Sequence, residues 1–221
     1  MERIILFDLD GTLTDPMVGI TGAVQYALKA YGIIEEDRRK LCPFIGPPLS
    51  DSFKEFYGFS EKDAREAIPV FHEYFVERGM YENRVYDGME DMLKKLNAAG
   101  FRLAVATSKP EVFAEQILKH FQLLQYFELV GGADMEEIRV RKGDIIKYTL
   151  KRLNASKMLS EGEYDVIMAG DRKHDVLGAK EAGIPCVGVL YGYGSREELL
   201  EAGADYIAET VEDLSEFLLN R

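Results

Sequence analysis

Two aspartates, Asp8 and Asp10, follow a four-residue apolar run near the N-terminus, within IILFDLDGTLTD. The run IILF predicts a buried strand, so both carboxylates lie at a strand end. A buried carboxylate without a partner costs several kcal/mol or takes up a proton. Two of them one residue apart therefore indicate a bound cation or a shared proton.

Polar residues also follow two later apolar runs. Thr107, Ser108 and Lys109 follow FRLAVA, and Asp171 and Asp175 lie in GDRKHD, directly after YDVIMA. In open α/β sheets, ligands bind at the carboxyl ends of the strands, so these residues are expected at one edge. Converging carboxylates and hydroxyls without His or Cys are typical of a hard-cation site. Mg²⁺ suits one or two carboxylates plus a substrate phosphate.

A basic residue, Lys142, lies in RVRKGD just before an expected helix. Together with Thr107 and the backbone N–H groups of a helix beginning near Pro110, it would supply donors for an anion. Arg139 and Arg141 lie beside Lys142, so the sequence leaves open which of the three bases serves the site. A solvated basic turn is the alternative.

The apolar runs predict a sheet. They are near-continuous, which is typical of strands covered on both faces in a parallel sheet, and they lie at residues 4–7, 101–106, 127–130, 164–169 and 185–190. Helical patterns follow at residues 89–99, 110–118 and 145–153, and others begin with a capping-box pattern at Ser195 and at Thr210. This alternation predicts an α/β fold with a doubly wound parallel sheet.

The acidic segment that ends the first strand is separated from the second run by residues 16–100, far more than the roughly dozen residues that a crossover needs. This interval carries helical patterns at 20–31 and 71–75 and no strand pattern, which favours an inserted helical bundle. We therefore expect an α/β core over residues 1–15 and 85–221 and a helical domain over 16–84, with YDG at 86–88 as the re-entry turn.

Composition disfavours several classes of protein. The net charge of -12, from 39 acidic against 27 basic residues, argues against nucleic acid as a partner. No apolar run approaches the ~18 residues of a membrane span, and MERIILF is too short for a signal peptide, so we expect a cytoplasmic protein. The two cysteines, Cys42 and Cys186, lack the spacing of a thiolate metal site or a disulfide framework.

Four segments resemble the haloacid dehalogenase-like superfamily, specifically its phosphatase branch: DLDGTLTD, the strand-final Thr107-Ser108, Lys142, and G-D-x-x-x-D in GDRKHD. The resemblance spans residues 4 to 175. It implies that Asp8 attacks phosphorus to form an aspartyl-phosphate and that Asp10 protonates the leaving oxygen. Because Asp10 is present, the dehalogenase branch, which lacks this acid, is disfavoured.

The resemblance also implies the binding residues. The phosphoryl group would be held by Thr107, Ser108, Lys142 and Gly11. The Mg²⁺ ion would be bound by Asp8, the backbone carbonyl of Asp10, Asp171 and Asp175, the last directly or through water.

A turn in the inserted region, FIGPPL at residues 44–49, is similar to one in phosphoglycolate-phosphatase-like and pyrophosphatase-like members. The resemblance places it in a cap that closes over the site and touches the leaving group. Gly46, Pro47 and Pro48 are therefore candidate specificity residues, and a simple helix–helix turn is the alternative.

We expect a Mg²⁺-dependent phosphatase acting on a small phosphorylated metabolite, with phosphoglycolate as the first candidate. A 5'-nucleotidase or pyrophosphatase comes next, and then a β-phosphoglucomutase-like mutase, which shares every core motif. From another class, a receiver-like or regulatory phosphate-binding protein has a similar acidic pair. The double-aspartate strand and the long insertion oppose that reading. We expect a monomer, with a homodimer as the alternative.

Overall fold

The computed structural model describes residues 2–135, 138–153 and 164–221. The chain divides into two compact units: a core unit of residues 1–14 and 85–221, and a helical unit of residues 15–84. It passes between them through β2 (Thr14–Asp15) and β3 (Arg84–Val85), which pair as a small two-stranded sheet.

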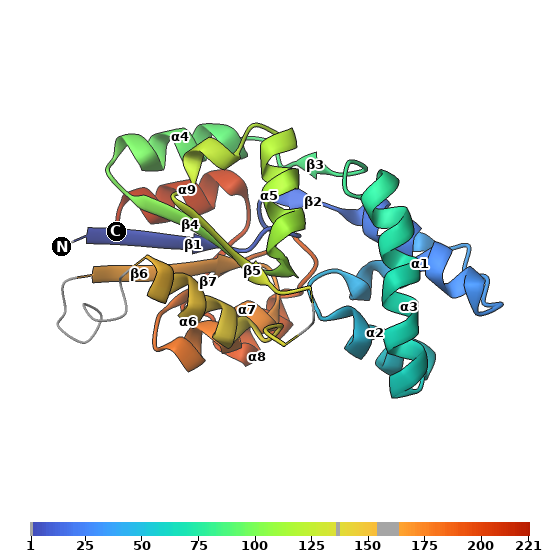
Figure 1. Cartoon of the computed structure of the whole chain (residues 1–221). Coiled ribbons are helices and arrows are strands. Elements are labelled where there is room, and N and C mark those ends of the chain that lie inside the picture. The colour runs from blue at the N-terminus through green and yellow to red at the C-terminus, as the bar shows by residue number, and fades with distance from the viewer. Residues whose placement is uncertain (1, 136–137, 154–163) are drawn as a thin grey trace. The chain divides into compact units, whose positions relative to one another are not determined.

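A six-stranded parallel sheet forms the centre of the core unit (Figure 1). In spatial order the strands are β5 (Leu129–Ala133), β4 (Arg102–Pro110), β1 (Glu2–Phe7), β6 (Tyr164–Gly170), β7 (Cys186–Val189) and β8 (Tyr206–Ala208). All five neighbouring pairs are parallel. The first strand is central and later strands are added on both sides of it, which confirms the doubly wound α/β fold.

Helices cover both faces of this sheet. Figure 1 shows α4 (Met89–Ala98), α5 (Glu111–His120) and α9 (Val211–Leu219) on one side. On the other side lie α6 (Lys142–Arg152), α7 (Lys173–Ala182) and α8 (Arg196–Ala202). A short 3-10 turn, Leu124–Tyr126, precedes β5. Among the described residues, every helix is too short or too polar to cross a bilayer.

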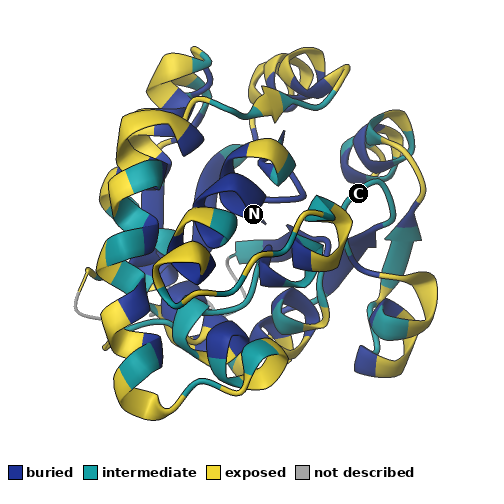
Figure 2. Ribbon diagram, turned by 90° about the vertical axis from the view of Figure 1, so that its right-hand side faces the viewer, coloured by how far each residue is buried: buried dark blue, intermediate teal, exposed yellow. Residues whose placement is uncertain are grey.

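The central strand shows why its sequence is continuously apolar. Ile4 and Leu6 pack in a cluster with Ile145 of α6, while Ile5 and Phe7 point to the opposite face, and all four strand residues are essentially inaccessible. Figure 2 shows buried residues filling the strands and the inner sides of the helices. Burial of each such side chain contributes about 2 kcal/mol, so β1 is a rigid base for the residues that follow it.

Several features of the core unit differ from the sequence patterns. Strand β5 begins two residues later and ends three residues later than the apolar run at 127–130. The edge strand β8 is not predicted, because three residues are too few to show a period. Ser195 caps α8 by accepting from Glu198 N at 3.1 Å, as expected. The Glu198 carboxylate, however, accepts from Lys173 N at 2.8 Å and pairs with Arg172 Nε at 2.9 Å. The first turn of α8 thus holds the start of α7.

Between its terminal β-residues, all of which are described, the helical unit contains helices and connecting segments but no strand. Its elements are α1 (Met17–Ala30), the 3-10 helix η1 (Arg38–Phe44), α2 (Leu49–Tyr57), α3 (Glu61–Tyr74) and the short π-helix η2 (Phe75–Gly79). Aromatic rings fill part of its interior: Phe44 lies edge-on to Phe53, with centroids 5.1 Å apart, and both are buried.

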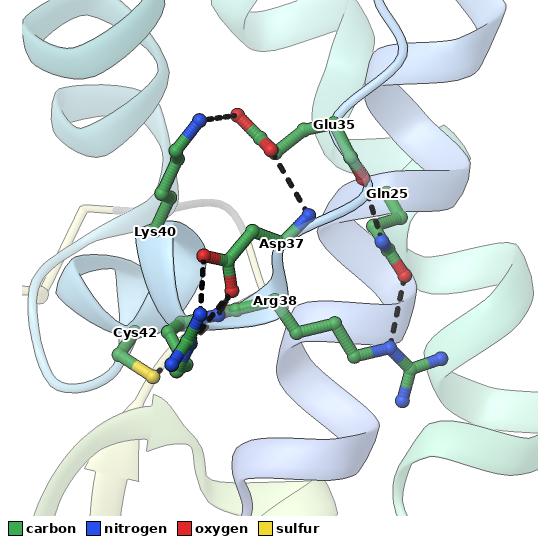
Figure 3. Close-up of polar contacts among 7 residues, drawn as sticks. Gln25, Glu35, Asp37, Arg38, Lys40 and Cys42 are labelled. Carbon is green, nitrogen blue, oxygen red and sulfur yellow. Dashed lines mark hydrogen bonds and ion pairs between the residues drawn. The ribbon is translucent and has the colours of Figure 1, made fainter.

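Polar contacts fix the connection from α1 to η1 (Figure 3). Gln25 donates from Nε2 to Glu35 O at 2.6 Å and accepts from Arg38 Nε at 3.0 Å. Asp37 caps η1 by accepting from Arg39 N at 3.0 Å. The connection therefore has a defined conformation.

The turn proposed for specificity joins η1 to α2. Gly46 has a φ of +104°, which favours glycine, and Pro48 immediately precedes the first helical residue, Leu49. The contribution of Gly46, Pro47 and Pro48 to substrate choice stays a prediction.

Candidate active site

Parallel pairing brings the ends of β1 and β6 together. Phe7 pairs with Ala169, and Asp8 N donates to Ala169 O at 2.9 Å. Asp8 is therefore fixed at the end of β1, and Asp171 follows β6 at the same edge. Both carboxylates are buried.

Three buried carboxylates form a compact triad. Asp8, Asp171 and Asp175 each offer one oxygen, and these atoms lie within 4.8 Å of one another. Burial, reinforced by the neighbouring carboxylates, raises the pKa of Asp171 well above its usual value. Burial also raises the pKa of Asp175 to about 6, although Lys142 opposes the shift. Because all donors are oxygen and a cation would relieve this repulsion, the triad can hold a hard metal ion.

Lys142 lies against two members of the triad. It is the first residue of α6, and its Nζ is 2.8 Å from Asp8 Oδ1 and 2.8 Å from Asp175 Oδ1. The ammonium also donates to Ala106 O at 3.0 Å. Burial disfavours its charge, but the two carboxylates outweigh that effect and raise the pKa of Lys142. Lys142 is therefore a buried cation next to Asp8.

The other two bases near Lys142 have different surroundings. Arg139 Nε donates to Gly132 O at 3.1 Å, and its guanidinium lies 3.7 Å from the ring centroid of Tyr148. Arg141 is the exposed residue that precedes α6. Of the three candidates, the structure brings Lys142 to the acids. Its phosphate-binding role stays a prediction.

A second lysine, which the sequence placed at a strand end without a role, pairs with Asp10. Lys109 Nζ lies 2.7 Å from Asp10 Oδ2, and both side chains are less than 10% exposed, at 7% and 9%. Burial raises the pKa of Asp10, and Lys109 opposes the shift. In the sequence, the only sign that Lys109 lies near the site is its position directly after Thr107 and Ser108.

The end of β4 is irregular, and this irregularity places Thr107, Ser108 and Lys109. From Ala106 to Pro110, β4 advances four residues while its partner β5 advances only two, from Gly131 to Ala133. Such bulges re-aim side chains and recur next to active sites. Thr107 is buried there and accepts from Lys109 N at 3.2 Å, and Ser108 is partly buried.

Gly11 affects the site through its lack of a side chain. Its N–H donates to Thr14 O at 2.8 Å, so the backbone donor predicted for phosphate is engaged there. Its φ is +83°, and a Cβ at this position would collide with the Asp171 carboxylate. The absence of a side chain at Gly11 therefore makes room for Asp171.

The glycine-rich turn after β7 also holds Asp171, which the sequence patterns did not reveal. Tyr193 N donates to Asp171 Oδ2 at 2.8 Å, and a Cβ at Gly192 would collide with Asp171. Thr12 Oγ1 approaches Asp171 Oδ1 at 3.4 Å, and Tyr191 donates its hydroxyl to Thr12 O at 3.1 Å. Asp171 is thus fixed from two sides.

We expect Gly11→Ala to impair divalent-metal binding by displacing Asp171. The variant also carries about 1 kcal/mol of backbone strain at positive φ. Gly100→Ala is the matched control, because Gly100 has the same φ of +83° and nothing within 4 Å of its Cβ position. Calorimetric Mg²⁺ titration of both variants checks this. Equal affinities in the two would contradict a steric role for Gly11.

Comparisons with known proteins show the family to which the chain belongs. The family model described as haloacid dehalogenase-like hydrolase matches residues 5–189. A 5'-nucleotidase from Pseudomonas aeruginosa is 46% identical over 88% of this chain and 86% of its own length. A tyrosine-protein kinase, PtkA from Mycobacterium tuberculosis, is 36% identical over 98% of this chain and 72% of its own length. Phosphoglycolate phosphatases from Colwellia psychrerythraea and Vibrio parahaemolyticus are 31% and 30% identical, each over 95% of its own length and 96% and 97% of this chain.

A solved structure supports the same conclusion. The crystal structure of a protein described as a predicted phosphatase from Clostridium acetobutylicum is 46% identical, covers 100% of both chains and superposes with a TM-score of 0.94. The family model covers most of the chain, and the expected resemblance is confirmed. The chain belongs to the haloacid dehalogenase-like hydrolase family and is a phosphatase of that family.

Proposed function

We propose that the protein is a Mg²⁺-dependent phosphatase that hydrolyses a small phosphomonoester through an aspartyl-phosphate on Asp8. The observation that carries the proposal is the buried acid triad next to Lys142. The residues at the end of β4 and Asp10 complete the site.

The donor set fits a magnesium ion. Four buried carboxyl groups, those of Asp8, Asp10, Asp171 and Asp175, are accompanied by two buried ammonium groups. The set therefore has an excess of two negative charges when all six groups are ionised. Asp8, Asp171 and Asp175 would hold the ion, and the Asp10 backbone carbonyl is a further proposed ligand. When bound, Mg²⁺ would neutralise charge on the acids and on the phosphoryl oxygens.

The chain's own residues account for both half-reactions. An Asp8 oxygen forms a bond to phosphorus while the ester P–O bond breaks, and Asp10 gives its proton to the leaving oxygen. Water then attacks the phosphorus of the aspartyl-phosphate and gives a proton to Asp10, while the bond between phosphorus and the Asp8 oxygen breaks; inorganic phosphate leaves and the Asp8 carboxylate is restored. Lys142 and Thr107 hold the transferred group, which lowers the cost of its charge in a buried site.

The identities of the curated relatives help to rank the candidate substrates. The sequence placed phosphoglycolate first, but the 5'-nucleotidase relative is 46% identical, whereas the phosphoglycolate phosphatases are 30% and 31% identical. We therefore propose a 5'-nucleoside monophosphate as the first candidate and phosphoglycolate as the second.

A substrate panel tests the proposal. Purified protein with Mg²⁺ is incubated with 5'-nucleoside monophosphates, phosphoglycolate, pyrophosphate and β-glucose 1-phosphate, and phosphate release is followed over many turnovers. We expect sustained release from at least one monoester, highest for a nucleotide. No release from any compound would refute the proposed hydrolysis of a small phosphomonoester, and formation of glucose 6-phosphate without release would indicate a mutase.

We expect Mg²⁺ to stabilise the protein more at about pH 8 than at about pH 5. Protons compete with the ion for the triad, because burial raises the pKa of Asp175 to about 6 and raises that of Asp171 well above its ordinary value. These folded-state pKa values lie above the unfolded ones, so ionisation destabilises the metal-free protein as pH rises through them. Thermal unfolding with and without Mg²⁺ at both pH values checks this. An increment that grows as pH falls would contradict the assigned ligands.

A further inference from the structure

The two carboxylate oxygens of Asp10 have different surroundings. Oδ2 lies 2.7 Å from Lys109 Nζ, whereas Oδ1 is buried and has no hydrogen-bond partner among the described residues. A buried carboxylate oxygen without a partner is costly in a finished fold. One oxygen of Asp10 is thus held by a cation, while no hydrogen-bond donor of the described residues engages the other.

The backbone around Lys109 is constrained by its neighbours. Lys109 lies in the bulged end of β4, and its N–H donates to Thr107 Oγ1 at 3.2 Å. On the neighbouring strand, a Cβ at Gly132 would stand 2.6 Å from Glu111 N and 2.8 Å from Lys109 O. Only glycine there lets the bulged segment approach so closely. The lysine is thus presented by a constrained backbone rather than by a flexible loop.

We propose that Lys109 is a positioning residue that holds Asp10 by Oδ2 and thereby reserves Oδ1 for proton transfer to the leaving oxygen. The inference rests on the proposed role of Asp10 as proton donor. In the first half-reaction the proton passes from Oδ1 to the ester oxygen as the P–O bond breaks. Asp10 is left as a carboxylate, with Lys109 still at Oδ2. No other reactant is required.

Positioning predicts a specific kinetic signature. Proton donation matters most when the leaving oxygen is strongly basic, and matters little when the leaving group departs readily as an anion. A lysine with a purely structural role would slow all substrates alike. If the lysine orients Asp10 for proton transfer, its replacement should slow mainly the substrates with poor leaving groups.

The test is a leaving-group series of substituted phenyl phosphates, from p-nitrophenyl phosphate to phenyl phosphate, with Mg²⁺ saturating. The parameter kcat/KM covers all steps through departure of the phenolate, so its dependence on leaving-group basicity reports the proton transfer. For Lys109→Met we expect a loss of roughly tenfold or more on phenyl phosphate and less than about threefold on p-nitrophenyl phosphate. Lys109→Arg, which still supplies donors to Oδ2, should largely keep the wild-type dependence.

Two further variants serve as references for this result. Lys119→Met is the control, because Lys119 is an exposed residue of α5, and it should match the wild type throughout. Asp10→Asn should show the full selective loss. If Asp10→Asn slowed all substrates equally, the proton-donor role itself would be wrong.

If Asp10→Asn were selective but Lys109→Met were not, only the inference on Lys109 would be overturned. Lys109→Met leaves a buried carboxylate without its cation, so thermal unfolding is measured for every variant. Should that variant not fold, Lys109→Ala takes its place, because water can enter the space vacated by the side chain. A wild-type dependence in a folded Lys109→Ala protein would equally overturn the proposal.

Discussion

Replacing Asp8 by Asn should abolish phosphatase turnover while the protein stays folded. An amide oxygen is a far weaker nucleophile than a carboxylate, and the substitution also removes one oxygen ligand of the triad. By analogy with other nucleophile deletions, kcat should fall by at least roughly 10⁴-fold. Phosphate release with the best substrate of the panel measures the loss, and circular dichroism with thermal unfolding verifies the fold.

The matched control for this variant is Asp91→Asn. Asp91 is an exposed acid in the first turn of α4, so the same chemical change there should leave turnover within about twofold of wild type. Persistent turnover by a folded Asp8→Asn protein would contradict the assignment of Asp8 as the nucleophile.

Replacing Lys142 by Met should destabilise the protein and remove its activity. The side chain is 4% exposed and contacts two buried carboxylates, which would then lie uncompensated. Removing one partner of a buried ion pair costs about 3–5 kcal/mol. The loss should be greatest at alkaline pH and shrink as pH falls, because protonation of Asp175 relieves the repulsion; its pKa is raised to about 6 with Lys142 present and rises further once that cation is removed. Denaturant unfolding at several pH values measures it.

Lys147→Met serves as the control on the same helix. Lys147 is exposed, so the substitution should change the free energy of unfolding by less than about 0.5 kcal/mol. A Lys142→Met protein as stable as this control at alkaline pH would show that the contacts of Lys142 with Asp8 and Asp175 contribute little to the free energy of unfolding.

The sequence predicted those features that depend on local pattern. The apolar run before Asp8 identified β1, and the alternation of runs and helices identified the sheet. Because parallel strands end at one edge, Asp8 and Asp171 could be expected to meet there, and the structure places them within reach of one ion. Their catalytic and metal-binding roles remain predictions.

What the sequence could not predict depends on register and side-chain direction. The pairing of Lys109 with Asp10 follows from the two-residue shift at the end of β4, which has no periodic signature. The fixing of Asp171 by Tyr193 N depends on the turn in GVLYGYG, whose glycine spacing matches neither the Rossmann nor the P-loop pattern. Glu198 likewise follows capping-box spacing, yet its carboxylate binds the start of α7.

The most direct test of the account is to look for phosphate on Asp8. Protein with Mg²⁺ and substrate is quenched in acid within a single turnover, digested and analysed by mass spectrometry. We predict a phosphoryl adduct on the peptide that contains Asp8, and its absence when Mg²⁺ is chelated or when Asp8 is Asn. Burst release of the alcohol product with no adduct at Asp8, or an adduct on another residue, would contradict the account.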